Sequence, residues 1–141
     1  MSRIYWDTML FVYWIEENPR YIGRIHQLLE KMKLRGDRLH TSSFAVGETL
    51  TGFYKSGSFE IARKVREILR PPTVEVISYS LEAADLYAQI RAKGGVSTPD
   101  AIHLACAAHA GIDLFLTNDN QLLGKVIPGI QFIAGIDSDL L

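Results

Sequence analysis

Residues 97–119 constrain the fold of this chain more than any other stretch of the sequence. Thr98 can cap a helix, and Pro99 suits its first turn, where a missing N–H costs nothing. After a run rich in Ala and Leu, Gly111 ends the helix, and Leu114–Leu116 is the short apolar run typical of a strand buried on both faces. The stretch therefore predicts a helix packed antiparallel to the parallel strand that follows it.

This order brings two acids to one edge of the predicted sheet. A helix that packs antiparallel to the next strand begins where that strand ends, so Asp100 and Asp119 are expected to meet. Arg3–Trp6 has the character of a strand, and if it runs parallel to Leu114–Leu116, Asp7 directly after it lies at the same edge. Open α/β sheets bind ligands at this edge. Three carboxylates in one small volume raise one another's pKa or require a cation, for which a divalent metal ion is the usual solution.

Glu48 is a fourth acid without an obvious structural role. Residues 41–43 offer caps for a helix that runs through Phe53, and the Glu48 side chain is long enough to reach back to the same edge. The remaining acids lie on helix faces, in first turns, in turns or in the tail, where solvation and the helix dipole account for them. Taken singly, Asp100 suits the first turn of a helix and Asp119 suits a turn, and each of the four could be structural. Their joint placement on one edge favours chemistry.

The rest of the pattern is that of an α/β protein. The apolar run Met9–Ile15 is typical of a helix that is largely buried or covered by a partner. We expect further strands at residues 39–41, 74–77 and 131–134, and further helices at residues 21–32, 43–53, 59–70 and 80–94. The expected fold is a three-layer α/β/α arrangement with a mostly parallel central sheet of four to five strands, in one domain spanning residues 1–141.

Composition excludes several classes of protein. The formal net charge is -1, so the chain lacks the overall basic excess that by itself indicates a nucleic-acid-binding protein. The single cysteine, Cys106, excludes a disulfide within the chain and is read as a small buried apolar residue. No secretory signal is evident, and the longest apolar run, Met9–Ile15, is too short to span a bilayer. We expect a soluble, cytoplasmic protein that does not associate with membranes.

Four segments together resemble the PIN-domain nucleases and, more narrowly, the VapC toxins of bacterial and archaeal toxin–antitoxin pairs. The segments are Asp7-Thr8, Ser43–Glu48, Thr98–Ala105 and Leu116–Asp119. The likeness covers nearly the whole chain in order and spacing. It implies a PIN-like fold, metal-dependent cleavage of single-stranded RNA and an antitoxin partner. It also implies a catalytic, metal-binding quartet with supporting roles for two hydroxyl residues, namely Asp7, Glu48, Asp100 and Asp119 with Thr8 and Thr117.

The chemistry expected of such a quartet is that of a hard cation. Mg²⁺ or Mn²⁺ prefers oxygen ligands and is typically held by one or two carboxylates, waters and the substrate phosphate. We expect Asp7 and Asp100 as first ligands, with Asp119 and Glu48 binding directly or through water. The ion would activate a water and neutralise charge on the phosphoryl oxygens. His103, one turn after Asp100, is not needed as a base in this scheme.

Two other functions are alternatives to the nuclease, and two kinds of surface are expected on the chain. A haloacid-dehalogenase-type phosphatase also places an Asp after its first strand but needs a second Asp two residues later, where Met9 stands. A non-catalytic interaction module is the other alternative. Basic residues at 20–38 and 63–70 either track an RNA backbone or form solvated helix faces. Residues 9–15 and 43–70 are expected to form homodimer and antitoxin surfaces.

Overall fold

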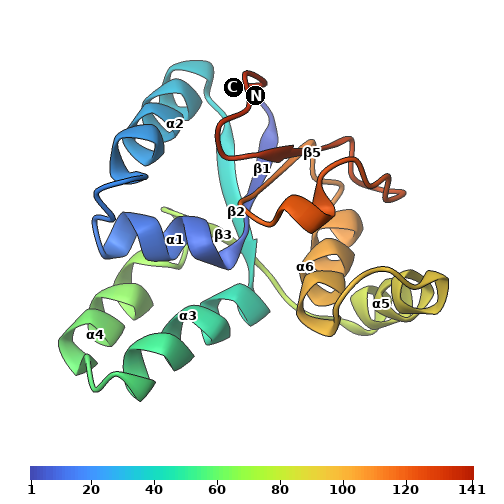
Figure 1. The fold of residues 1–141 in the computed structure, drawn as a ribbon, viewed down its shortest axis with the longest axis horizontal. Coiled ribbons are helices and arrows are strands. Elements are labelled where there is room, and N and C mark those ends of the chain that lie inside the picture. Colours follow the sequence, from blue (N-terminus) through green and yellow to red (C-terminus); the bar gives the residue numbers. More distant parts are fainter.

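A central five-stranded sheet organises the computed structural model, which describes residues 1–141 (Figure 1). Every strand pairing is parallel, in the order β3-β2-β1-β4-β5, so the sheet is more uniform than the mostly parallel one expected. The strands are β1 Arg3–Trp6, β2 Arg38–Ser42, β3 Glu75–Ile77, β4 Leu114–Thr117 and β5 Phe132–Gly135.

Helices cover both faces of the sheet. Figure 1 shows α1 to α4 on one side of the strands and α5 and α6 on the other. The bounds are α1 Thr8–Ile15, α2 Ile22–Arg35, α3 Ser43–Lys55, α4 Phe59–Ile68, α5 Leu81–Lys93, α6 Thr98–His109 and the 3-10 helix η1 Asn120–Leu122. None of these helices has the length and apolar character needed to cross a membrane.

Two apolar cores flank the sheet because successive side chains of a strand point to opposite faces. Ile4 and Trp6 of β1 lie in the larger core, with residues of α1 and α2 such as Leu10 and Leu28. Tyr5, between them, lies in the smaller core with Leu104 of α6. The layers are therefore helix, sheet and helix, which confirms the expected α/β fold class.

The strand order creates a switch point between β1 and β4. From β1 the chain adds β2 and β3 outward on one side, then returns through α5 and α6 to place β4 on the other side of β1. Trp6 pairs with Leu116 near the ends of the two strands. Parallel sheets form a crevice where the strand order reverses, outside the carboxyl ends of the strands. Asp7 and Asp119 follow the two strands at this crevice.

The start of α6 differs by one residue from the sequence prediction. Ser97, and not Thr98, is the N-cap: its backbone is extended and its Oγ accepts a hydrogen bond of 3.3 Å from the Asp100 N–H. Pro99 then lies in the first turn, as expected. The acid is thereby fixed in the first turn of a helix that begins at the crevice.

Candidate active site

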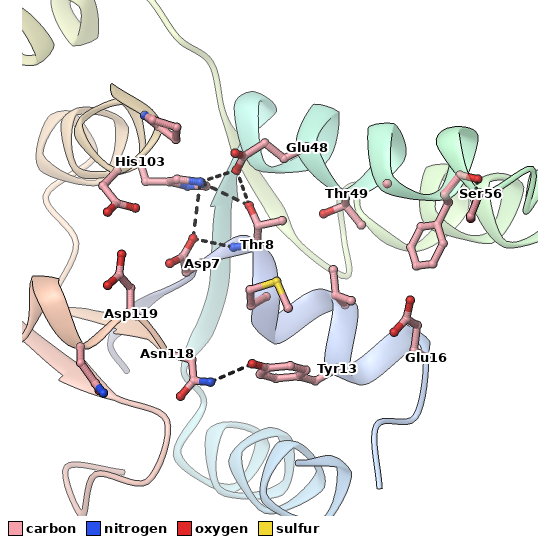
Figure 2. Close-up of a pocket in the computed structure, with 17 residues that line it drawn as sticks. Asp7, Thr8, Tyr13, Glu16, Glu48, Thr49, Ser56, His103, Asn118 and Asp119 are labelled. Carbon is pink, nitrogen blue, oxygen red and sulfur yellow. Dashed lines mark hydrogen bonds and ion pairs between the residues drawn. The ribbon is translucent and has the colours of Figure 1, made fainter. Parts of the chain in front are cut away.

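The four predicted acids line one cavity at the crevice. It has a volume of about 760 Å³, and its walls come from the β1–α1 junction, α3, α6 and the segment after β4. Figure 2 shows Asp7, Glu48 and Asp119 around this space, with Thr8 and His103 between the first two. The four acids in its lining are Asp7, Glu48, Asp100 and Asp119. The structure thus brings together residues that are far apart in the sequence.

Asp7 is held rigidly by its neighbours. It is the N-cap of α1, and its Oδ1 accepts a hydrogen bond of 2.7 Å from the Thr8 N–H. Its Oδ2 accepts a hydrogen bond of 2.8 Å from the Thr117 hydroxyl. Its own N–H donates to the Leu116 carbonyl at 3.0 Å. With 9% of its surface exposed, Asp7 presents a fixed carboxylate at the floor of the cavity.

Thr117 joins two of the acids. Besides donating to Asp7, its Oγ1 accepts a hydrogen bond of 3.0 Å from the Asp119 N–H. Asp119 in turn caps η1, where its Oδ1 accepts from the Gln121 N–H at 2.9 Å. Thr117 is completely buried, so its hydroxyl can form hydrogen bonds only with other groups of the protein. It therefore sets the spacing of Asp7 and Asp119, which suits the supporting role expected of it.

Asp100 and Asp119 form a carboxyl pair. Burial, the hydrogen bond with Asp119 and the negative charges of Asp119 and Asp7 raise the pKa of Asp100 to about 6. A shift in this direction is what two carboxyl groups at close range produce when no cation separates them. Asp100 therefore keeps a proton in mildly acidic solution. A divalent cation can replace that proton.

Glu48 has the opposite electrostatic setting. Its Oε1 accepts hydrogen bonds from the Thr8 hydroxyl at 2.6 Å and from Nε2 of His103 at 2.7 Å. Burial raises the pKa of Glu48, but these two hydrogen bonds outweigh it and hold the pKa below its ordinary value. Glu48 therefore stays ionised while Asp100 takes up a proton.

Sequence reasoning gave too little weight to His103. The side chain is 1% exposed, and Nε2 lies 3.4 Å from Oδ1 of Asp7 in addition to its bond with Glu48. The spacing from Asp100 was the available signal, because residues three apart share one face of a helix. Asn118 was also missed. Its amide donates to the Tyr13 hydroxyl at 2.7 Å and so ties the segment after β4 to α1 (Figure 2).

The residues present fit a hard divalent cation, although they form no ready-made cage. No group of three or more His, Cys, Asp or Glu side chains is arranged to hold a metal ion by itself. Mg²⁺ does not require one, because it is usually bound by one or two carboxylates together with waters and substrate phosphate. The pairing of Asp100 with Asp119 supplies such a donor set, and a cation there would offset the repulsion between the two carboxyl groups.

Comparison with known families agrees with this arrangement. The sequence model of the PIN domain matches residues 4–126. The chain belongs to the PIN-domain family. This confirms the family inferred from the four motifs and leaves the phosphatase alternative without support. No curated protein sequence matches this PIN domain significantly.

Solved structures share the fold at low sequence identity. One is VapBC2 from Rickettsia felis, bound to a DNA fragment from its promoter, with a TM-score of 0.75 at 20% identity. The alignment covers 94% of this chain and 98% of that one. A toxin–antitoxin complex from Klebsiella pneumoniae has a TM-score of 0.67 at 21% identity, covering 90% and 94%. VapC20 from Mycobacterium tuberculosis, a Sarcin-Ricin loop cleaving toxin, has a TM-score of 0.66 at 18% identity, covering 79% and 86%. This PIN domain therefore has a VapC-like fold.

Proposed function

We propose that this PIN domain is a metal-dependent endoribonuclease that cleaves single-stranded RNA and is the toxin of a toxin–antitoxin pair. The observation that carries the proposal is the convergence of four acids from separate elements on one cavity. Membership of the PIN-domain family and the fold shared with VapC20, a Sarcin-Ricin loop cleaving toxin, support it.

The acids divide into two roles in this proposal. Asp7 and Asp100 are the first ligands proposed for Mg²⁺ or Mn²⁺, and Asp119 and Glu48 contribute directly or through water. When bound, the ion supplies positive charge at the scissile phosphate and lowers the pKa of water. Because Oε1 of Glu48 is occupied by Thr8 and His103, its other oxygen is left to orient a water or accept its proton. Thr8 and Thr117 keep Asp7 and Glu48 in place.

Several of the basic residues at 20–38 form hydrogen bonds or ion pairs within the chain. Arg24 donates to the carbonyls of Ile136 and Ser138, and Lys31 donates to the carbonyl of Leu141. Arg35 forms an ion pair with the nearby Asp37 carboxylate at 3.1 Å. These contacts favour the structural explanation of the face of α2, and they leave α4 as the more suitable surface for an RNA backbone.

On α4 the basic side chains are only partly neutralised. Arg63 pairs with Glu60 at 3.2 Å and with Glu67 at 2.8 Å. Lys64 of α4, and Arg70 just after the end of this helix, have no acidic partner within 4 Å. Uncompensated cations of this kind supply the salt-dependent part of RNA binding. The proposed path of the RNA therefore runs from the cavity toward α4.

Partners follow from the same proposal. The similar structures include toxin–antitoxin complexes, so an antitoxin is the protein partner that we propose. The homodimer stays a prediction. Helix α1 buries Leu10, Phe11 and Tyr13 within the chain and leaves Met9 44% exposed, so it offers less surface to a second copy than its sequence indicated. Sedimentation at micromolar concentration tests the dimer.

The test of the proposed function is cleavage of a labelled single-stranded RNA by the purified chain, free of any inhibitory partner. Activity is expected with Mg²⁺ or Mn²⁺ and none with EDTA. A matched duplex RNA and a single-stranded DNA of the same sequence serve as substrate controls. Absence of cleavage under all these conditions would favour the non-catalytic interaction module.

A further inference from the structure

The imidazole of His103 is held on every side. Nδ1 lies 2.6 Å from the Tyr5 hydroxyl, and Nε2 lies 2.7 Å from Oε1 of Glu48. The rings of Tyr5 and Phe44 pack edge-on against it, with centroids 5.9 and 5.3 Å away. A buried ring with a partner at each nitrogen and two aromatic rings packed against it has a single orientation.

The neighbours of Nε2 determine where a proton must be. They are Oε1 of Glu48 at 2.7 Å, Oγ1 of Thr8 at 3.3 Å and Oδ1 of Asp7 at 3.4 Å. The Thr8 hydroxyl already donates its hydrogen to Glu48, and an ionised carboxylate can only accept. Nε2 therefore carries a hydrogen and donates it to Glu48. On the other side, the Tyr5 hydroxyl can donate to Nδ1 or accept from it, so it satisfies either protonation state of the ring.

Tyr5 is itself anchored. Its ring stacks on Phe115 at a centroid distance of 4.8 Å, and its hydroxyl lies 2.8 Å from Oγ of Ser42, the N-cap of α3. Burial raises the pKa of Tyr5 well above its ordinary value, so the hydroxyl keeps its proton. A buried chain of contacts thus runs from the start of α3 through β1 and α6 and returns to α3 at Glu48.

We propose that His103 is a positioning residue whose Nε2–H fixes the Glu48 carboxylate beside Asp7, and that Tyr5 orients His103 for this task. Without His103, only the Thr8 hydroxyl holds the flexible, partly exposed side chain of Glu48. His103 lines the cavity, but only 2% of its side chain is exposed and its Nε2–H is used by Glu48, so it is not itself the general base. The inference depends on the proposed function only for what a correctly placed Glu48 does to RNA.

Two substitutions separate positioning from packing. In His103→Gln, the side-chain amide can occupy the place of Nε2 and still donate to Glu48. In His103→Asn, the shorter amide reaches the place of Nδ1 and loses Glu48. Groups that orient metal-binding side chains typically contribute 10- to 100-fold to activity or metal affinity. We expect His103→Asn to lose about 10- to 100-fold in single-turnover cleavage and His103→Gln to recover at least half of that loss on a logarithmic scale.

A double-mutant cycle shows whether His103 acts through Glu48. In a Glu48→Ala background, His103→Asn should cost nothing further, because the group that it positions is gone. Tyr5→Phe keeps the stacked ring and removes only the hydroxyl, so it should lower the rate in the same direction by a smaller factor. If His103→Asn does not give a cooperative melting curve, the rate of Tyr5→Phe tests the positioning role in its place. Equal rates for Asn and Gln at position 103, or an undiminished loss in the Glu48→Ala background, would overturn the inference.

A second readout separates this inference from the proposed function. Mn²⁺ dissociation constants of the same proteins, measured by electron paramagnetic resonance, need no RNA. If the parent chain cuts no RNA, the nuclease proposal fails, and the order of Mn²⁺ affinities (parent, then Gln, then Asn) still supports the positioning role. Mn²⁺ affinities left unchanged by His103→Gln, His103→Asn and Tyr5→Phe, in a chain that does not cleave RNA, would overturn that role.

Discussion

The hydroxyl of Thr117 lies 2.8 Å from Oδ2 of Asp7, although 110 residues separate them in the chain. The contact exists because β1 and β4 are adjacent parallel strands whose ends meet at the switch point of the sheet. The same hydroxyl accepts from the Asp119 N–H, so one buried side chain sets the floor of the candidate active site. The geometry of the site therefore depends on the Thr117 hydroxyl as well as on the acids that it contacts.

Thr117→Val should test that arrangement. The substitution keeps the shape of the side chain but leaves Oδ2 of Asp7 and the Asp119 N–H without their partner. A buried polar group without a partner costs about 1–3 kcal/mol, so thermal unfolding should show a loss of stability of that size. Cleavage should fall as well. Thr117→Ser, which retains the hydroxyl, is the control, and a Ser variant as inactive as Val would argue against the role of the hydroxyl.

Asp100 should make the metal-free protein less stable as pH rises. Its pKa in the folded chain is about 6, above its ordinary value near 3.8, so the folded state binds this proton more tightly than the unfolded state does. Its contribution to stability is therefore lost between about pH 4 and pH 6. The shift corresponds to about 3 kcal/mol, and solvent screening at this half-buried group reduces it to about 1 kcal/mol. The difference in unfolding free energy between the parent and Asp100→Asn, measured from pH 4 to 8, reports it.

Asp100→Asn should be at least as stable as the parent at neutral pH while losing RNA cleavage, because the substitution removes a repelled charge. A gain of about 1 kcal/mol would raise the melting temperature by about 3 °C in a chain of this size. Asp139→Asn removes the same charge from the exposed tail and is the matched control. An Asp100→Asn protein that melts far below the parent would identify the acid as structural.

Metal addition should stabilise the folded chain. An ion that binds only the folded state at 100 times its dissociation constant adds about 2.7 kcal/mol. Because the ion competes with the proton on Asp100, stabilisation by Mn²⁺ should be larger at pH 7.5 than at pH 5. Calorimetry with and without EDTA measures this. A melting temperature that does not respond to Mn²⁺ in the parent chain would argue against the metal site.

Much of this site followed from local signals in the sequence. The carboxyl ends of parallel strands and the start of an antiparallel helix share one edge, so the positions of Asp7, Asp100 and Asp119 depend only on recognising three elements. Glu48 followed from its distance along α3. The α6 cap was misplaced by one residue because Ser97 and Thr98 are both good caps, and only backbone geometry separates them.

Long-range side-chain contacts were not predictable in the same way. The bonds of His103 to Tyr5 and Glu48 join residues 98 and 55 positions apart, and no periodicity encodes them. The pattern of α2 correctly indicated a basic face. The partners of Arg24 and Lys31 in the C-terminal segment could not be read from the helix itself, so an RNA-binding face and a structural one looked alike.

The most direct test of the central claim compares cleavage of one single-stranded RNA by the parent chain and by Asp100→Asn, each with Mn²⁺ and with EDTA. The account predicts cleavage by the parent with Mn²⁺ alone, and none by Asp100→Asn although that protein is folded. Equal cleavage by both proteins, or cleavage by the parent that persists in EDTA, would contradict a metal-dependent nuclease site built on these four acids.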